Sequence, residues 1–260
     1  MRLAVLSRND RIIIFSGLAF LVALAWAYLV HLDRQMSAAM QEGQSMASMG
    51  MSMDMPWTIT DAVYTFVMWA VMMVAMMTPS AAPVVLLFAG MQRRQSGQRL
   101  PVILFIFGAG YLLVWSGFSA AAAAAQWALH QAAMLSPAMK AVSPWLAGGI
   151  LIAAGIYQLT PSKRACLTHC QSPLGFLMSH WRNGNAGALR MGISHGAYCV
   201  GCCWALMCVL FVVGVMNLVW VAALSVLVLL EKIGPAGQFI ARVAGAGMVV
   251  AGIVILIRSL

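Results

Sequence analysis

Long apolar runs dominate this chain of 260 residues, of which 63% are hydrophobic and only 8% are charged. Soluble globular domains carry about 25% charged residues, so the composition excludes an ordinary soluble domain. A helix needs about 20 apolar residues to cross a bilayer, and its backbone hydrogen bonds must be satisfied within the membrane. The predicted fold class is therefore all-α, as a polytopic transmembrane helix bundle.

The apolar runs predict about seven spanning helices. They cover residues 12–30, 62–90, 101–126, 143–160, 196–214, 217–231 and 238–257. Only a short turn separates the fifth run from the sixth, so a bundle of six spans remains an alternative. The first run resembles a signal peptide, but its length and the lack of a small-residue cleavage site favour a retained span. Residues 1–260 are thus predicted to form a single integral membrane domain.

Basic residues are distributed unevenly between the ends of these runs. With the N-terminus in the cytoplasm, twelve of the 15 Lys and Arg residues lie inside, among them Lys163 and Lys232, and three lie outside. This predicts a multi-pass protein of the inner (plasma) membrane with a cytoplasmic N-terminus. Residues 31–60 then form an extracytoplasmic loop, and residues 161–195 form a cytoplasmic loop. Orientation accounts for the net charge of +9, and we expect no nucleic-acid partner.

Five methionines fall within the second apolar run, at Met68, Met72, Met73, Met76 and Met77. On a helix, residues 68, 72 and 76 form one stripe, and residues 73 and 77 form a second stripe beside it. A thioether is a soft, uncharged donor that favours Cu(I) and can lie in hydrocarbon without the cost of a buried charge. Ordinary core packing is the alternative, because methionine also fills irregular gaps.

Two prolines follow these methionines, at Pro79 and Pro83. Each removes a backbone donor, so we expect the second helix to be broken at this point. Irregular backbone at bilayer depth is tolerated where it lines a cavity, and transporter substrate sites favour such places. The methionine stripes are therefore the candidate intramembrane relay for Cu(I).

The predicted outer loop, residues 31–60, is rich in methionine. Its last four methionines alternate with other residues, at Met49, Met51, Met53 and Met55. The loop is also rich in Gly, Ser and Gln, so it cannot bury these side chains in a core of its own. We interpret it as a Cu(I)-capturing segment on the oxidising side of the membrane, where thioethers do not form disulfides. An amphipathic segment lying on the membrane is the alternative.

Cysteine and histidine residues gather at two places that the charge pattern puts at the cytoplasmic boundary. The candidate metal ligands there are Cys166, His169, Cys170, His195, Cys199, Cys202 and Cys203. Thiolate with imidazole suits Cu(I) or zinc, so Cu(I) is the expected metal and zinc an alternative. Residues 199 and 202 also match the CxxC spacing of a redox pair. The structural alternative is that they are small buried apolar residues, which we accept only for Cys208.

Glu231 and Lys232 end the sixth apolar run. A carboxylate at that depth is costly unless it is paired. The simplest expectation is a local pair between Glu231 and Lys232 or Arg242, and a role in proton or cation passage is the alternative.

Three motifs resemble those of a known bacterial family. They are the paired-methionine segment 72–83, the segment 157–170 with its two cysteines, and the CVGCCW segment 199–204. The Leu-Glu-Lys end at residues 230–232 also matches, and the resemblance covers about residues 60–235. The family is described as predicted metal-binding integral membrane proteins of unknown function. The resemblance implies metal binding at these methionines and cysteines, and it implies no reaction.

The sequence thus predicts a metal-binding membrane protein that handles Cu(I) by capture, relay and binding, for transport or delivery. Its expected partners are the lipid bilayer, the metal ion, and a metallochaperone or copper protein. A membrane copper enzyme or metal-site assembly factor is one alternative, and a thiol–disulfide carrier is a second. The sequence contains no hydrolase triad, phosphate-binding glycine loop or paired catalytic carboxylates, so it favours a non-enzymatic function without deciding the question.

Overall fold

The computed structural model describes residues 6–48, 58–95, 100–136 and 139–259. Within these ranges the regular elements are helices, apart from one isolated bridge between Leu135 and Ala141. The predicted all-α class is confirmed. The helices are α1 (Arg8–Ser48), α2 (Ile59–Gln95), α3 (Leu100–Gln131), α4 (Pro144–Leu159), α5 (Pro161–Gln171), α6 (Pro173–His180), α7 (Gly184–Cys208), α8 (Leu210–Val213), α9 (Leu218–Ile233) and α10 (Gly237–Arg258).

Among the described residues, five helical segments are long and apolar enough to cross a membrane. They are Arg8–Ala39, Ile59–Arg93, Leu100–Gln131, Gly184–Val213 and Gly237–Arg258. Helices α4 and α9 have 16 residues each, about 24 Å at a rise of 1.5 Å per residue. That length falls short of a hydrocarbon core of about 30 Å, so the predicted number of about seven spans is not confirmed.

The fifth and sixth predicted spans lie in separate elements. Gly214 ends α8 with a φ of +103°, a conformation that glycine adopts without steric strain. Asn217 then caps α9, because its side chain accepts a hydrogen bond from the backbone N–H of Trp220. A turn and a new cap therefore divide this region, rather than one long tilted helix crossing it.

Both predicted loops contain more helix than expected. Helix α1 continues to Ser48, so residues 31–48 of the predicted outer loop extend the first helix. Ala, Met and Gln are frequent there, and all three are good helix formers. The predicted inner loop, residues 161–195, contains α5, α6 and the first half of α7.

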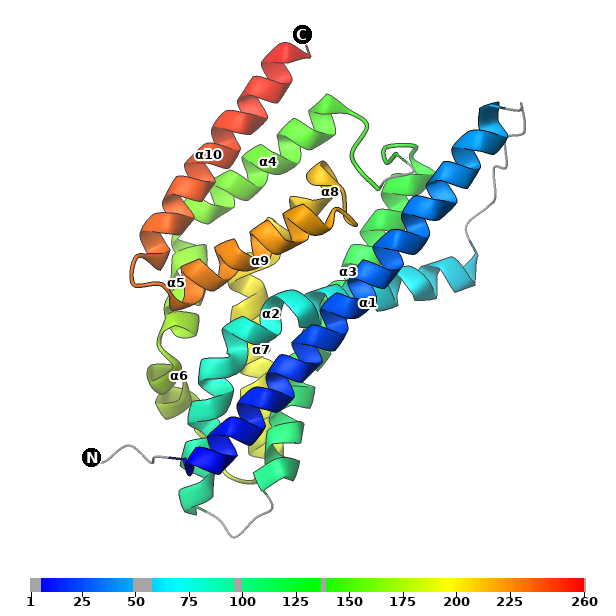
Figure 1. Cartoon of the computed structure of the whole chain (residues 1–260). Helices are drawn as coiled ribbons and strands as arrows, with labels where there is room; N and C mark the ends of the chain where they lie inside the picture. The colour runs from blue at the N-terminus through cyan, green and yellow to red at the C-terminus, as the bar shows by residue number, and fades with distance from the viewer. Residues whose placement is uncertain (1–5, 49–57, 96–99, 137–138, 260) are drawn as a thin grey trace.

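The expected break in α2 takes the form of a bend, because the helix runs through both Pro79 and Pro83. Figure 1 shows that α2 changes direction along its length instead of ending. Each proline removes one backbone hydrogen bond and favours a bend at that point. Ser80 Oγ also donates a hydrogen bond of 2.8 Å to the Met77 carbonyl, a local contact that often accompanies a helix bend. The bend leaves α2 in contact with α1, α3, α6 and α9.

Two close helix pairs organise the bundle. Helices α4 and α10 lie side by side at one end, and α3 packs along α7. In the second pair the backbones nearly touch, because a Cβ at Gly192 would lie 2.1 Å from the Phe107 carbonyl oxygen. Small residues allow this approach between membrane helices.

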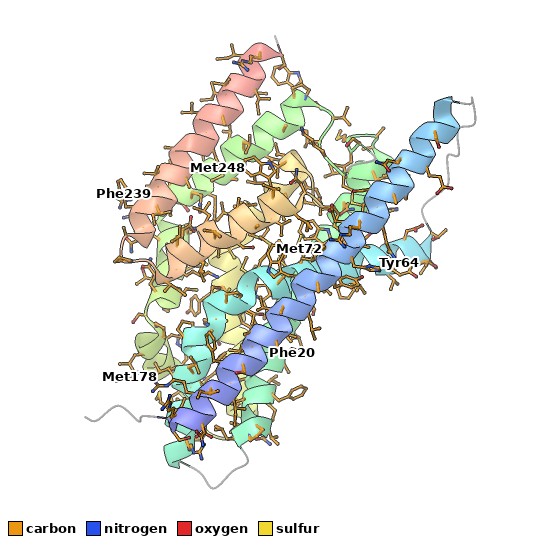
Figure 2. All side chains as sticks on the ribbon, viewed as in Figure 1. Phe20, Tyr64, Met72, Met178, Phe239 and Met248 are labelled. Atoms are coloured by element: carbon orange, nitrogen blue, oxygen red, sulfur yellow. The ribbon has the colours of Figure 1, made fainter. Side chains whose placement is uncertain are left out.

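The side chains sort into a buried interior and an apolar exterior. Met72 lies within the bundle, whereas Phe20 and Phe239 point outward from α1 and α10 (Figure 2). Large apolar side chains such as Phe105 on α3 and Val219 on α9 are also exposed. Exposed apolar surface of this extent is typical of a face that meets lipid or another protein.

The contact between α3 and α7 predicts a difference between two glycine substitutions. Gly192→Ala should lower the thermal unfolding temperature in detergent, because its methyl group meets the Phe107 backbone, and overpacking costs about 1–3 kcal/mol. Gly108→Ala is the matched control, since a Cβ there has no neighbour within 4 Å. Equal unfolding temperatures for Gly192→Ala and the wild type would contradict this packing.

Candidate metal site

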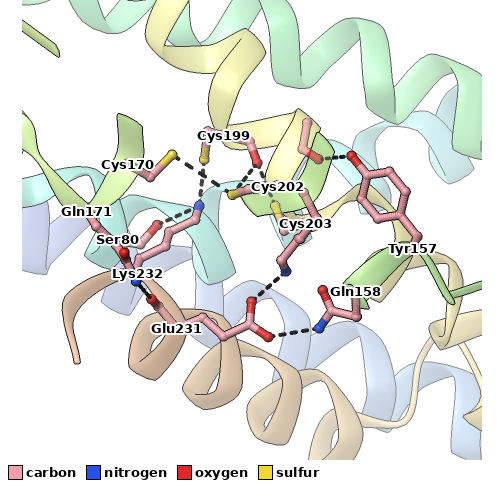
Figure 3. A network of polar contacts seen from close by, with 12 residues as sticks. Ser80, Tyr157, Gln158, Cys170, Gln171, Cys199, Cys202, Cys203, Glu231 and Lys232 are labelled. Atoms are coloured by element: carbon pink, nitrogen blue, oxygen red, sulfur yellow. Dashed lines mark hydrogen bonds and ion pairs between the residues drawn. The ribbon is translucent and has the colours of Figure 1, made fainter. Parts of the chain in front are cut away.

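A group of buried thiols lies where α7 meets α2, α5 and α9 (Figure 3). Its members are Cys170, Cys199, Cys202 and Cys203, and each side chain is at most 7% exposed. All six cysteines of the chain are free thiols. The helical spacing of residues 199, 202 and 203 places them along the interior of α7, and α5 brings Cys170 to them.

Two sulfur pairs are close enough to share an ion. Cys170 Sγ lies 3.9 Å from Cys202 Sγ, and Cys203 Sγ lies 3.8 Å from Met77 Sδ. Two donors at about 2.3 Å from one ion lie no more than about 4.6 Å apart. Both separations therefore fit a soft cation such as Cu(I), for which thiolates and thioethers are suitable ligands.

The sulfur atoms are arranged as pairs and not as one closed cage. Across the described ranges, no three His, Cys, Asp or Glu side chains are placed so that they could hold a metal ion together. The thiols of Cys202 and Cys203 instead donate to the Cys199 carbonyl oxygen, at 3.2 and 2.8 Å. Both thiols thus have a hydrogen-bond acceptor within α7 itself.

Lys232 is the positively charged member of the site. Its Nζ donates to Cys199 Sγ at 2.8 Å and to Ser80 Oγ at 3.3 Å, and it lies 4.0 Å from Met77 Sδ. The hydroxyl of Tyr111 lies 3.1 Å from the same Cys199 sulfur. Lys232 was predicted as a charge at the inner membrane boundary and as a candidate partner of Glu231, and its contact with the thiols was missed.

Glu231 points away from Lys232, because consecutive residues on a helix face directions about 100° apart. It forms a buried ion pair with Lys163 Nζ at 2.6 Å and accepts a hydrogen bond from Gln158 Nε2 at 2.8 Å. The expected local pair with Lys232 or Arg242 is therefore wrong. Lys163, also predicted as an inner loop charge, is almost completely buried.

Helix α5 is fixed in place at both of its ends. Thr160 caps its first turn, where Thr160 Oγ1 accepts from the Lys163 backbone N–H at 3.3 Å, and Pro161 occupies the first position. At its end, Gln171 Nε2 donates to the Glu231 carbonyl at 2.7 Å. Glu231 is thus contacted by one side chain from each end of α5. These contacts fix the position of α5 and therefore of Cys170.

Cys166 lies at the edge of the thiol group, on α5. It is half-buried, and its sulfur packs against Gly201 of α7, where a Cβ would lie 2.9 Å from it. Burial raises the pKa of the Cys166 thiol, and the nearby Cys202 raises it further. Both effects favour the neutral thiol over the thiolate at this position.

The two candidate histidines lie outside the sulfur pairs. His195 is buried among Phe107, Tyr111 and Phe176, and neither ring nitrogen has a hydrogen-bond partner in the structure. His169 is half-buried and stacks on Tyr198 at a centroid distance of 4.2 Å. Its Nδ1 lies 2.9 Å from the Ala165 carbonyl oxygen.

The five α2 methionines are all buried, with at most 3% of each side chain exposed. They share one hydrophobic cluster with the four buried thiols. Met207 and Met216 belong to the same cluster and were not predicted as site residues. Their isolated positions in the sequence gave no stripe that would have indicated them. Met49, Met51, Met53 and Met55 lie outside the described residues.

Comparison with known proteins gives one match. A family model described as PpoB2, copper chaperone, matches residues 66–255, which include the α2 methionines, the thiol group and Lys232. No curated protein and no solved structure matches the chain. The match confirms the expectation of a metal-related family, and copper is the metal that the family description names. It covers most of the sequence, and the chain belongs to the PpoB2 copper chaperone family.

Proposed function

We propose that this protein is a membrane-embedded copper chaperone that passes Cu(I) from buried thioethers to buried thiols for delivery to a copper protein. The observation that carries this proposal is the contact of 3.8 Å between Met77 Sδ and Cys203 Sγ. It joins the end of the methionine stripes of α2 to the thiol group of α7. A cation held by the stripes therefore has a thiol ligand directly beside its last thioether.

The apolar exterior supports a membrane location. Five helical segments are long and apolar enough to cross a bilayer, and large apolar side chains are exposed on several of them. The inner membrane and the cytoplasmic N-terminus are proposed from the distribution of basic residues. Lys163 and Lys232 are buried and do not count as loop charges, which leaves ten residues in the proposed inner group of twelve.

The donor chemistry supports Cu(I) as the cargo. Thioethers bind a soft monovalent cation without adding charge to an apolar interior, and thiolates bind it more tightly. Affinity then increases along the route from the α2 methionines to Cys170, Cys199, Cys202 and Cys203. Met49, Met51, Met53 and Met55 are proposed to capture the ion before it reaches α2. Cys166, His169 and His195 border the thiols and are proposed as accessory ligands.

A thiol–disulfide carrier is the second candidate, favoured by the 3.9 Å separation of the Cys170 and Cys202 sulfurs. That function leaves the buried methionines without a role. Delivery to a partner copper protein agrees better with the description of the family, and it includes the function of a metal-site assembly factor.

Removal of two thiols tests the proposed binding site. The double substitution Cys202→Ser and Cys203→Ser should abolish Cu(I) binding at the thiol group, because serine hydroxyls are hard donors that Cu(I) does not favour. The measurement is elemental analysis of reduced, anaerobic protein in detergent. Cys208→Ser is the matched control, because Cys208 lies outside the thiol group. Unchanged copper content in the double variant would refute the site. A disulfide between Cys170 and Cys202 in protein isolated without reductant would instead favour the carrier.

Replacement of two thioethers tests the proposed relay. Met73→Leu with Met77→Leu conserves volume and should cost less than about 1.5 kcal/mol of stability per site. Cu(I) transfer from an outside donor to a chelator enclosed in vesicles should slow by about tenfold, as expected from about 1.4 kcal/mol of lost ligand binding. Met178→Leu, at an exposed position of α6, should leave the rate unchanged. If the double variant transfers Cu(I) as fast as Met178→Leu does, the methionine stripes serve packing only.

A further inference from the structure

Lys232 places a buried ammonium group among the proposed copper ligands. Only 5% of the residue is exposed, and the side chain extends from α9 to sulfur and hydroxyl groups of α7 and α2 (Figure 3). Its Nζ lies 2.8 Å from Cys199 Sγ and 4.0 Å from Met77 Sδ. The ammonium therefore contacts one proposed thiol ligand and lies beside one proposed thioether ligand.

No carboxylate neutralises this ammonium in the described part of the chain. The ion pairs found there join Lys163 to Glu231 and Arg93 to Asp10. Glu231, the neighbour of Lys232 in sequence, is fully engaged by Lys163 and Gln158. A buried charge is costly unless it is paired, so the sulfur ligands are the groups left to balance the Lys232 charge.

The balance of charge depends on which cation enters. Two thiolates, the Lys232 ammonium and one monovalent cation together carry no net charge. A divalent cation on the same ligands leaves one uncompensated positive charge in an apolar interior. Coulomb repulsion from the ammonium also doubles with the charge of the entering ion, and it is screened little at a buried site.

Sulfur ligands alone do not provide this discrimination, because thiolates bind zinc and Cu(I) alike. We propose that Lys232 makes the thiol site selective for a soft monovalent cation over a soft divalent one. This inference rests on the proposed function, since it assumes that the cargo ion binds at the α7 thiols. Lys232 acts on selectivity through its fixed charge, and it is not itself a ligand.

The test is a competition between Ag(I) and Cd(II), which are soft cations of different charge. Reduced wild-type protein in detergent is exposed to equal concentrations of both, and elemental analysis gives the ratio bound. We expect the wild type to favour Ag(I). Lys232→Leu removes the charge without adding a sulfur ligand, and it should shift the ratio toward Cd(II) by about tenfold, or about 1.4 kcal/mol. The ratio is compared because loss of the ammonium changes the affinity for every cation.

Two further variants separate charge from shape. Lys232→Arg keeps the charge and should keep the wild-type ratio. Lys140→Leu removes an exposed lysine of the loop before α4 and should also leave the ratio unchanged. If Lys232→Leu does not fold, as judged by its elution profile and thermal unfolding, the wild-type ratio and Lys232→Arg still test the inference.

A wild type that binds Cd(II) as readily as Ag(I) would overturn the inference. So would an unchanged ratio in Lys232→Leu, or a ratio in Lys232→Arg that shifts as far as in Lys232→Leu. Each of these results is compatible with Cu(I) binding at the thiols, so the proposed function would stand. Failure of the wild type to bind either Cu(I) or Ag(I) would instead overturn the proposed function.

Discussion

A network of charged and amide side chains where α5 meets α4 and α9, with Gln158, Lys163 and Glu231 buried, determines how the thiol site is built. Glu231 accepts from Lys163 and Gln158 through its carboxylate and from Gln171 through its backbone carbonyl. Removal of one partner from a buried ion pair costs about 3–5 kcal/mol, because the other charge stays buried and unpaired. This network fixes α5, and with it Cys170, against α9. The Glu231 carboxylate is also occupied by Lys163 and Gln158, so it does not pair with Lys232. The Lys232 ammonium contacts the Cys199 thiol instead.

The interior then divides into two kinds of sulfur environment. The five α2 methionines form an uncharged, fully buried stretch, and the cysteines form a group that can acquire negative charge. Low dielectric makes the second environment sensitive to any nearby fixed charge. The site takes side chains from α2, α5, α7 and α9, so it depends on the packing of all four helices. That dependence agrees with a family match that extends over residues 66–255.

Local sequence patterns predicted the features that depend on neighbouring residues, namely the helices and the faces on which their side chains lie. Apolar runs gave the all-α class, and helical spacing put the five methionines on neighbouring stripes that proved to be buried. Cysteine spacing placed residues 199, 202 and 203 on one helix, although the contact of Cys170 with Cys202 required the folded chain. The bend at Pro79 and Pro83 was expected to be a break, because the sequence does not show that contacts with neighbouring helices accompany a continuous α2.

Long-range pairing could not be predicted. Glu231 and Lys163 are 68 positions apart, and Lys232 and Cys199 are 33 positions apart. Nothing in the sequence distinguishes a lysine that enters the interior from one that faces water at a helix end. A lone carboxylate at the end of an apolar run did indicate that some partner exists, and the folded structure supplied a distant one instead of a neighbour.

The close approach of α3 and α7 has a consequence for the thiol group. Gly192 lies against the Phe107 carbonyl with no room for a methyl group, so α7 packs backbone to backbone on α3. That contact positions the helix that carries Cys199, Cys202 and Cys203. Helix α5, which carries Cys170, is held separately, by Lys163 and Gln171 on Glu231 of α9. The four thiols thus rest on two independent supports, and a change at the second support would move Cys170 relative to the other three.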